Sequence, residues 1–349
     1  MAGASLYGQA DVPDAPDVPG APAGGGLPYG LDRLSNPWTR FLTRRLARLL
    51  VSVFVVVTAT FLMIHLIPGD PVRAALGLTA PADLVESRRE SLGLNEPLIT
   101  QYVSYLGGLF TGDLGTSMIS GTPVSEIIAD RLPQTALLGS LAFLTAVAIA
   151  VPLGLAMALL TRDGRRRGVE LGFTSTAAVM SAIPEFLLGV ALVAVFAVSL
   201  GWFPVAGMSG ASSFVLPVLA LALGPAMALA RILRVEALRV LGEDYVRTAR
   251  AKRLPRRLVY RRHVFPNALT SMLTIGGLVL GAMLIGTVLV ENVFAWPGLG
   301  MTIVESILQK DYPLVQGVVL VYGTSVLFLN LAVDVVLGIA DPRSTIRES

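Results

Sequence analysis

The chain has 349 residues, of which 54% are hydrophobic and 15% are charged, and its formal net charge is +3. Soluble domains carry about 25% charged residues, so this composition excludes an ordinary soluble domain and indicates a multi-span membrane protein. The sequence has no cysteine, its two histidines are far apart, and its basic residues form no single stripe, so we expect no disulfide, no catalytic metal centre and no nucleic-acid binding.

The N-terminal segment, residues 1–42, is rich in Gly, Pro, Ala and Asp and has little apolar periodicity. Such a segment cannot bury enough apolar surface to fold, which predicts a disordered cytoplasmic tail without a secretory signal. A partner-binding arm is the alternative interpretation of this segment. A short C-terminal tail is expected at 344–349.

Six apolar runs are long enough to cross a hydrocarbon core of about 30 Å, which needs roughly 20 residues. They cover residues 46–66, 136–160, 177–200, 214–233, 270–292 and 315–337. All six should be helices, because only helices or closed barrels satisfy the backbone in lipid and the period-two alternation of barrel strands is absent. The sequence therefore predicts an all-α integral membrane protein with six transmembrane helices, the first within 43–66 and the other five in a core domain at 136–343.

The distribution of Lys and Arg predicts the orientation in the membrane. If the N-terminus is cytoplasmic, 22 of the 27 Lys and Arg residues fall in cytoplasmic segments and the other five fall on the opposite side. Cytoplasmic loops of membrane proteins carry such an excess of positive charge. Both termini are therefore expected in the cytoplasm.

The longest loop, residues 67–135, follows the first span and is expected outside. Within it, residues 91–110 carry apolar side chains at helical spacing, including Leu98, Tyr102 and Tyr105. This spacing predicts a folded extracytoplasmic loop. Two roles stay open for it, since it can cap the outer face of the bundle or receive another protein.

A strongly basic loop, residues 234–269, separates the fourth and fifth spans. Each Arg or Lys at a bilayer centre costs roughly 2.5 to 3.5 kcal/mol on insertion scales, so this segment must lie outside the hydrocarbon. Ala249 and Ala251 are small enough for close approach of another protein, while Tyr245 and Leu254 are candidate apolar anchors beside arginines that can pair with carboxylates. The alternative is an anchor that contacts anionic lipid.

Ten strings along the chain resemble one family of transport proteins. They are LIPGDP (66–71), LGLNEPLITQY (92–102), GDLGTS (112–117), GWFPVAG (201–207), YVRTARAKRL (245–254), RHVFPNAL (262–269), VENVFAWPGLG (290–300), KDYPLVQG (310–317), NLAVD (330–334) and ADPR (340–343). Together they resemble the permease subunit of bacterial ABC importers for dipeptides, oligopeptides and nickel. The long first loop resembles that of the first permease of the pair. The resemblance implies the type I ABC importer permease fold.

Permeases of this family carry a cytoplasmic loop that docks on the ATPase subunit and contains a Glu-Ala-Ala motif, a Gly and a later Pro. Matching the motif to this chain places Arg247 at the Glu, Ala249 at the second Ala, Arg253 at the Gly, with Lys252 before it, and Pro266 at the Pro. The resemblance implies that this loop couples the permease to the ATPase. Because Gly between two short helices usually supplies a positive φ, Arg253 is expected either to be strained or to mark a different turn.

Polar residues inside spans are costly and often functional, and the candidates here are Glu185, Glu291, Asn330 and Asp334. If the third helix starts just before Glu185, this residue lies at the cytoplasmic interface, which is the favoured placement. If the helix starts several turns earlier, Glu185 lies near the bilayer centre and faces the pathway or a partner group. Asn330 and Asp334 share one helix face and are expected to join a packing network rather than to bind substrate.

The segment FAWPGLG (294–300) follows the fifth span. Trp296 suits a membrane interface, Pro297 breaks the helix, and the two glycines permit a tight re-entry of the chain. This turn is predicted to form part of an outer gate. The residues predicted for this gate, or for docking of a binding protein, are Asp113, Gly115, Trp296, Pro297, Gly298 and Gly300.

The sequence lacks a G-x-x-x-x-G-K-[ST] phosphate loop, so the energy source must lie on other chains. The resemblance implies a non-catalytic subunit that binds no cofactor itself. Its expected partners are a second homologous permease, two ATPase subunits carrying ATP and Mg, an extracytoplasmic substrate-binding protein and membrane lipid.

Peptide uptake by alternating access across the bacterial cytoplasmic membrane is the favoured function of this multi-pass chain. Nickel or another small solute is the alternative cargo. A secondary transporter is less favoured, because such carriers have paired ionisable residues at mid-membrane and inverted repeats, and the sequence shows no convincing repeat and few buried charges.

Overall fold

The computed structural model describes residues 37–340 except 67–69, 78, 92 and 165. This part of the chain is helical and contains no β-strand, which confirms the predicted all-α class. Its α-helices are α1 (Pro37–Leu66), α2 (Pro71–Leu76), α3 (Ala82–Ser91), α4 (Leu98–Thr111), α5 (Val124–Leu160), α6 (Arg167–Ala182), α7 (Glu185–Leu192), α8 (Val215–Gly242), α9 (Asp244–Ala251), α10 (Arg256–Val259), α11 (Phe265–Val293), α12 (Leu299–Gln309) and α13 (Tyr312–Ala340).

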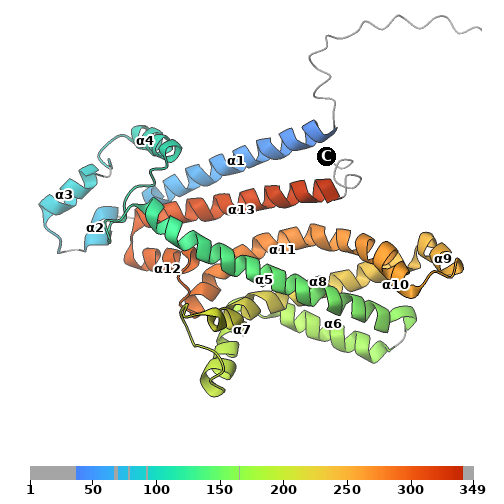
Figure 1. Cartoon of the computed structure of the whole chain (residues 1–349). Helices are drawn as coiled ribbons and strands as arrows, with labels where there is room; N and C mark the ends of the chain where they lie inside the picture. Colours follow the sequence, from blue (N-terminus) through green and yellow to red (C-terminus); the bar gives the residue numbers. More distant parts are fainter. Residues whose placement is uncertain (1–36, 67–69, 78, 92, 165, 341–349) are drawn as a thin grey trace, which may run out of the picture.

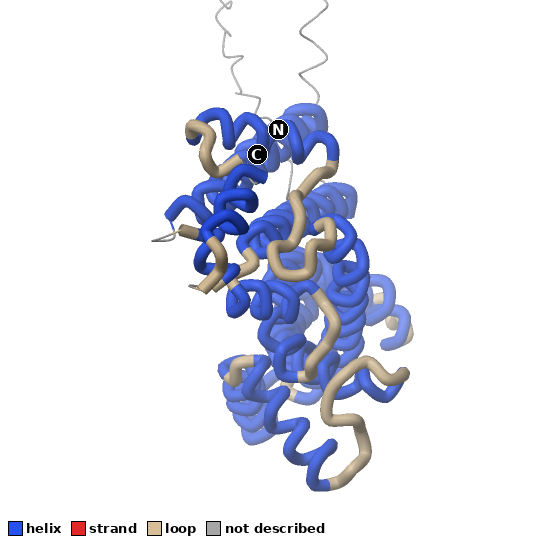
Figure 2. The backbone as a smooth tube through the Cα atoms, turned by 90° about the vertical axis from the view of Figure 1, so that its left-hand side faces the viewer, coloured by secondary structure: helices blue, strands red, loops and turns tan. Residues whose placement is uncertain are grey.

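The long helices lie side by side in one bundle (Figure 1). α1 packs along α13, while α8 packs against α5, α6, α7 and α11. Helices α2, α3 and α4 gather at one end of the bundle, and α9 and α10 lie at the opposite end (Figure 1). Figure 2 faces the end that carries α2 to α4, where loops cross in front of the helices. The two ends of the bundle therefore carry different sets of short helices.

Within the described residues, five helical spans are long and apolar enough to cross a membrane. A sixth crossing requires the pair Arg167–Ala182 and Glu185–Ser199 together, and these two segments are bent by 98°. The run 177–200, expected to form one helical span, is therefore divided into two helical segments. The cause is Pro184, because a proline keeps the residue before it out of the helical region, and Ile183 has an extended backbone with φ −76° and ψ 122°.

Several helices extend beyond the apolar runs that predicted them. α5 begins at Val124, well before its apolar run, and Val124 is fully buried. α8 continues to Gly242, past the end of its apolar run. Backbone hydrogen bonds do not stop where the hydrocarbon ends, so these extra turns persist where they pack. As a result, the predicted loop 234–269 is reduced to 243–264, because its two ends belong to α8 and α11.

The first described residues of the chain are helical. α1 begins at Pro37, so the last residues of the predicted N-terminal tail, 37–42, are helical. The rest of that tail and the predicted C-terminal tail, 344–349, lie outside the described residues.

Small side chains bring α5 and α8 into close contact. On α5 they are buried and recur every fourth residue, at Ala142, Ala146, Ala150, Gly154 and Ala158. On α8 the buried small residues that share clusters with them are Ala220, Ala222, Ala226, Ala230 and Ala237. In lipid, helix association depends on this kind of close packing, because the hydrophobic effect does not distinguish a neighbouring helix from a lipid tail.

Replacing Gly154 with Val should separate these two helices. A Cβ at position 154 would lie 2.7 Å from the carbonyl oxygen of Ala230 and 3.0 Å from Cβ of Leu233, so the backbone has to move. We expect the free energy of unfolding to fall by about 1–3 kcal/mol, measured as a lower midpoint of thermal aggregation in detergent. The matched control is Gly172→Val in α6, where a Cβ meets nothing within 4 Å. Parental stability of the Gly154 variant would contradict this prediction.

Candidate functional site

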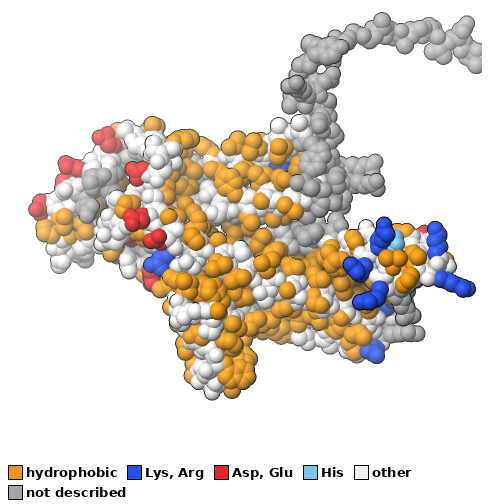
Figure 3. All heavy atoms as spheres, in the orientation of Figure 1, with side chains coloured by type: hydrophobic (Ala, Val, Ile, Leu, Met, Phe, Trp, Pro, Cys, Tyr) orange, Lys and Arg blue, Asp and Glu red, His pale blue; other side chains and the backbone are white. Residues whose placement is uncertain are grey.

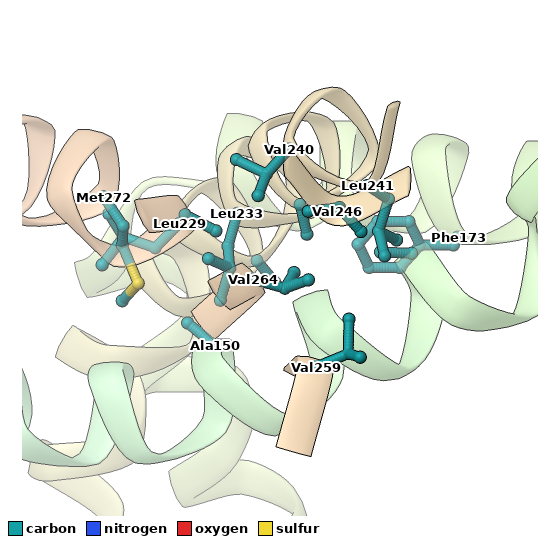
Figure 4. Packing of buried hydrophobic residues seen from close by; sticks show 14 of the residues in the cluster. Ala150, Phe173, Leu229, Leu233, Val240, Leu241, Val246, Val259, Val264 and Met272 are labelled. Carbon is teal, nitrogen blue, oxygen red and sulfur yellow. The ribbon is translucent and has the colours of Figure 1, made fainter. Parts of the chain in front are cut away.

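The segment between α8 and α11 folds onto the end of the bundle. It consists of α9, α10 and a π-helical turn, and its side chains Val246, Val259 and Val264 are buried in one cluster with Phe173 and Leu233 (Figure 4). These contacts join the segment to α6 and α8. Motion of α9 is thereby mechanically linked to the spanning helices.

One face of α9 points into the bundle. Val246 and Ala249 lie three residues apart and are 0% and 6% exposed, and Leu254 packs against the same cluster. The bundle therefore covers Ala249, which leaves it no surface for contact with another protein, whereas Leu254 is half-buried and its role as an apolar anchor stays a prediction. The exposed residues of the predicted coupling set are Tyr245, Arg247, Ala251, Lys252, Arg253 and Pro266.

The exposed side of this end is cationic. Figure 3 shows Lys and Arg gathered over α9 and α10, whereas Asp and Glu gather at the opposite end. The Arg247 side chain is 72% exposed and pairs with Asp244 at 3.4 Å, a contact of little strength in water. Burial and then the Glu243 carboxylate raise the pKa of Tyr245 above its ordinary value, so its phenol stays protonated. A partner would meet a neutral aromatic ring among positive charges.

The turn after α9 has the backbone that a glycine would supply. Arg253 has φ 56°, in the left-handed region. Its N–H donates to the carbonyl of Arg250 at 2.9 Å, and the Leu254 N–H donates to the carbonyl of Ala249 at 3.3 Å, which are the two bonds of a Schellman helix end. Of the two expected alternatives, the strained one holds. The other motif residue, Pro266, lies in the first turn of α11.

An ion pair that the sequence did not reveal fixes the C-terminal part of α8. The Arg234 side chain is 9% exposed, and it donates to Glu170 Oε1 at 2.6 Å and to Thr161 Oγ1 at 3.0 Å. It therefore ties α8 to α6 and to the end of α5. The available signal was an arginine directly after an apolar run, but the sequence does not identify its partners.

At the opposite end, a buried carboxylate organises the turn between α11 and α12. Glu291 is fully buried, and its Oε2 accepts hydrogen bonds from the N–H groups of Gly300 at 2.6 Å and Met301 at 3.2 Å. These donors belong to the first turn of α12, where free N–H groups favour an acceptor with negative charge. Thr135 of α5 accepts from the Leu299 N–H at 2.8 Å. Three helices therefore meet at this turn.

Gly298 and Gly300 are needed at this turn because there is no room for a side chain. A Cβ at Gly300 would lie 2.5 Å from Cα of Val288, and one at Gly298 would lie 2.6 Å from Oγ1 of Thr135. The left-handed residue of the turn is Ala295, with φ 46°. The glycines thus allow close approach of chain segments rather than an unusual φ.

Trp296 belongs to the core of the bundle. Its side chain is 0% exposed, packs edge-on against Phe214 with ring centroids 4.6 Å apart, and donates from Nε1 to the carbonyl of Gln134 at 3.3 Å. The prediction that Trp296 lies at a membrane interface is therefore wrong. Pro297 follows it in the turn, beyond the end of α11 at Val293.

The loop after α4 is tied to the start of α13. Asp113 accepts from the Gly115 N–H at 2.9 Å, which shapes a local turn. The tie itself is Asp311, 1% exposed, which accepts from the Ser117 hydroxyl and from the Met118 N–H at 3.0 Å. Asp113 and Gly115 thus lie near the end of α12, while the glycine turn lies at its start. α12 separates the two predicted parts of the outer site.

Helices α2 and α3 are also held together by a polar contact. Asp70 accepts from the Val72 N–H at the start of α2 and from Arg89 of α3 at 2.5 Å. Burial raises the pKa of Asp70, but the hydrogen bonds from Arg89, Val72 and Arg73 outweigh it and leave the pKa below its ordinary value. The charged form of Asp70 therefore holds α2 against α3.

The remaining polar residues of the spans contact neighbouring helices. Asp334 pairs with Arg45 of α1 at 2.5 Å, and a Cβ at Gly281 of α11 would lie 2.9 Å from Asn330 Oδ1. These are helix-packing contacts of the kind expected from the sequence.

Glu185 lies deeper than the favoured prediction. A Cβ at Gly286 of α11 would lie 3.8 Å from Cδ of Glu185. Gly286 precedes the end of α11 by seven residues, or about 10 Å at 1.5 Å per residue. Glu185 therefore lies in the half of the bundle nearer the glycine turn. The favoured placement at the end that carries α9 is therefore not supported, because α6 precedes the break at Pro184 and α7 starts only beyond it, at Glu185.

The family of the chain follows from comparison with known proteins. Residues 150–346 match the family of binding-protein-dependent transport system inner membrane components, and residues 38–139 match the N-terminal part of such membrane components. The chain belongs to this family. It is a permease subunit of a bacterial ABC importer and a multi-pass protein of the inner membrane.

The match to this chain extends over almost the whole length of two relatives. A protein of Brucella suis biovar 1, named as a candidate peptide transport system permease, is 39% identical over 87% of this chain and 98% of its own. The glutathione transport system permease protein GsiC of Escherichia coli O6:H1 is 37% identical over 86% of this chain and 97% of its own. Among solved structures, the inward-facing MetNI methionine ABC transporter gives a TM-score of 0.49 with 18% identity, covering 62% of this chain and 96% of that chain.

Arg253→Gly should leave the turn of this permease intact, whereas Arg253→Val should loosen it. A left-handed conformation costs an ordinary residue about 1–2 kcal/mol, and more for a β-branched one, while Gly adopts it freely. We expect amide hydrogen exchange across α9 and α10 to accelerate at least fivefold in the Val variant and to stay near parental rates in the Gly variant. Lys252→Val is the control, since Lys252 has φ −74°. Equal exchange in Arg253→Val and Lys252→Val would contradict the prediction.

Gly300→Val should abolish uptake by the assembled importer. A Cβ 2.5 Å from the Val288 backbone must displace α12 and with it the hydrogen bonds to Glu291. We expect uptake to fall more than tenfold at unchanged membrane expression, measured with a labelled substrate in cells. Gly107→Val on α4 is the matched control, because a Cβ there meets nothing within 4 Å. Parental uptake by the Gly300 variant would show that the turn tolerates displacement.

Proposed function

We propose that this permease imports short peptides, including peptide-like compounds of the size of glutathione, delivered by an extracytoplasmic binding protein. The relatives that cover nearly their full length support this cargo, since their names refer to peptides and to glutathione. The chain would form half of the translocation pathway, beside a second homologous permease.

The observation that carries the proposal is the outward face of α9. It presents Tyr245 and Arg247 to the surrounding medium while Val246 and Ala249 fix the same helix to the bundle. An ATPase subunit that binds the outward face of α9 would therefore move the spanning helices when it changes conformation. This face suits a cleft in each of the ATPase subunits, where apolar and carboxylate groups receive the aromatic ring and the guanidinium. ATP and Mg would be bound by those subunits.

The outer end would receive the binding protein. With both termini in the cytoplasm, α2 to α4, the loop at 113–118 and the turn at 294–300 face outward. Asp311 and Glu291 connect that loop and that turn to α13 and α11. Docking and ATP binding must each favour one conformation, because a ligand with equal affinity for two states shifts neither.

The test is ATP hydrolysis by the reconstituted complex with and without its substrate-loaded binding protein. We expect the double variant Tyr245→Ala, Arg247→Glu to lower the stimulated rate roughly tenfold, as for other interface hot spots, while the complex still inserts and the permease pair still forms. Arg40→Glu is the control, a charge reversal on an exposed residue of a different helix, α1. Normal stimulation of the double variant would refute docking at α9.

Cargo is tested in the same liposomes. Labelled di- and tripeptides and glutathione should enter in a manner that needs ATP and the binding protein. Uptake of Ni²⁺ without any competition by peptides would overturn the peptide assignment and leave the coupling proposal untouched.

A further inference from the structure

Arg250 carries a buried donor without an acceptor. Among the described residues, its Nη2 has no hydrogen-bond partner, although the atom is shielded from solvent. An unpaired polar group in such a place is costly, and a charged one more so. Native proteins resolve such a deficit with a bound water, ion or ligand.

The unpaired guanidinium lines a cavity of about 550 Å³ between α9, α10 and the end of α5. Arg162 lines the same cavity, and its charged lining is completed by Asp163. Asp163 is 68% exposed and lies 3.4 Å from Arg162, so it does not neutralise Arg250. With two arginines and one carboxylate in its lining, the cavity therefore carries an excess of positive charge.

A second cavity of about 500 Å³ adjoins the first, and Leu159 and Tyr260 line both. Its lining is almost entirely apolar, with Leu155 of α5 and Leu241 of α8 among its walls. α5 leaves the membrane at this level, because its last residue is Leu160 and the basic segment follows. A cationic cavity and an apolar one thus meet at the depth of the lipid headgroups.

We propose that these joined cavities bind one anionic phospholipid. Its phosphate would accept from Arg250 and Arg162, and one acyl chain would lie along Leu155 and Leu159. Phosphate oxygens suit guanidinium groups in geometry as well as charge. The occupied site would join α9 to the end of α5, so the lipid stiffens the coupling segment.

A lipid suits this place better than a carboxylate from the ATPase. Arg247 and Arg250 are neighbours three residues apart on α9 but differ in exposure, since the Arg247 side chain is 72% exposed whereas Nη2 of Arg250 is shielded from solvent. The ATPase docking proposed above uses the face of Arg247. The apolar walls contributed by α5 and α8 have no role in binding a lone carboxylate.

Lipid retention by the purified complex tests this site without any transport activity. The complex is exchanged into nanodiscs that contain equal amounts of phosphatidylglycerol and phosphatidylcholine. It is then released from the nanodiscs, and the lipid that stays bound to it is measured by native mass spectrometry. We expect Arg250→Gln to lower retained phosphatidylglycerol roughly fivefold, the effect of one basic residue near an anionic surface. Arg247→Gln, the same change on the same helix, should leave retention unchanged. Leu159→Glu, at a residue that is 46% exposed, should lower it as well.

Equal retention in Arg250→Gln and Arg247→Gln would overturn the lipid site, as would loss of the bound lipid to millimolar inorganic phosphate, since a free anion would then suffice. Loss of ATPase subunits from Arg250→Gln with unchanged lipid would assign the cavity to a partner carboxylate instead. Anionic lipid should raise stimulated ATP hydrolysis in the parent and not in Arg250→Gln. Lipid binding without this rise would leave the site standing and refute its role in coupling.

Discussion

The close contact between α5 and α8 is the constraint on which both ends of the molecule depend. In lipid, two helices gain little from apolar surface alone, so their small residues must bring the backbones together. At Gly154 the helices are so close that a Cβ would lie 2.7 Å from the carbonyl oxygen of Ala230. α8 leads into α9 with one residue between them, and α5 extends from the outer loop to the cavity beside Arg250. The position of each end is thus set by the same pair of helices.

Polar anchors fix the two ends of that pair. At one end Thr161 of α5 accepts from Arg234, and at the other Thr135 of α5 accepts from the backbone of α12. These two threonines are 26 residues apart, or about 39 Å along a helix. The charged members of the anchors, Arg234 and Glu291, come from α8 and α11. Buried polar groups form hydrogen bonds only in particular geometries. These anchors therefore restrict the relative positions that α5, α8, α11 and α12 can adopt.

Apolar run length predicted the long helices because lipid leaves the backbone no alternative, and it failed where local chemistry intervenes. Pro184 breaks the third run, a local effect that its hydropathy does not reveal. Trp296 and Ala249 were assigned to a surface from residue type, yet a large aromatic or a small apolar side chain suits a packed core equally well. Their burial depends on which face of the chain meets Phe214 or Leu233, and that is decided by tertiary contacts.

The turn at Arg253 shows how a departure from a family pattern can preserve its geometry. The bonds from Arg253 and Leu254 to the preceding turn, together with the packing of Leu254, hold the backbone in the left-handed conformation although position 253 is not a glycine. The local strain is then tolerated because the surroundings over-determine the conformation. Arginine in place of glycine adds an exposed cation just after the end of α9. Within α9, the Arg247 side chain is exposed and Nη2 of Arg250 is shielded from solvent. The proposed docking face and the proposed lipid site rest on this difference.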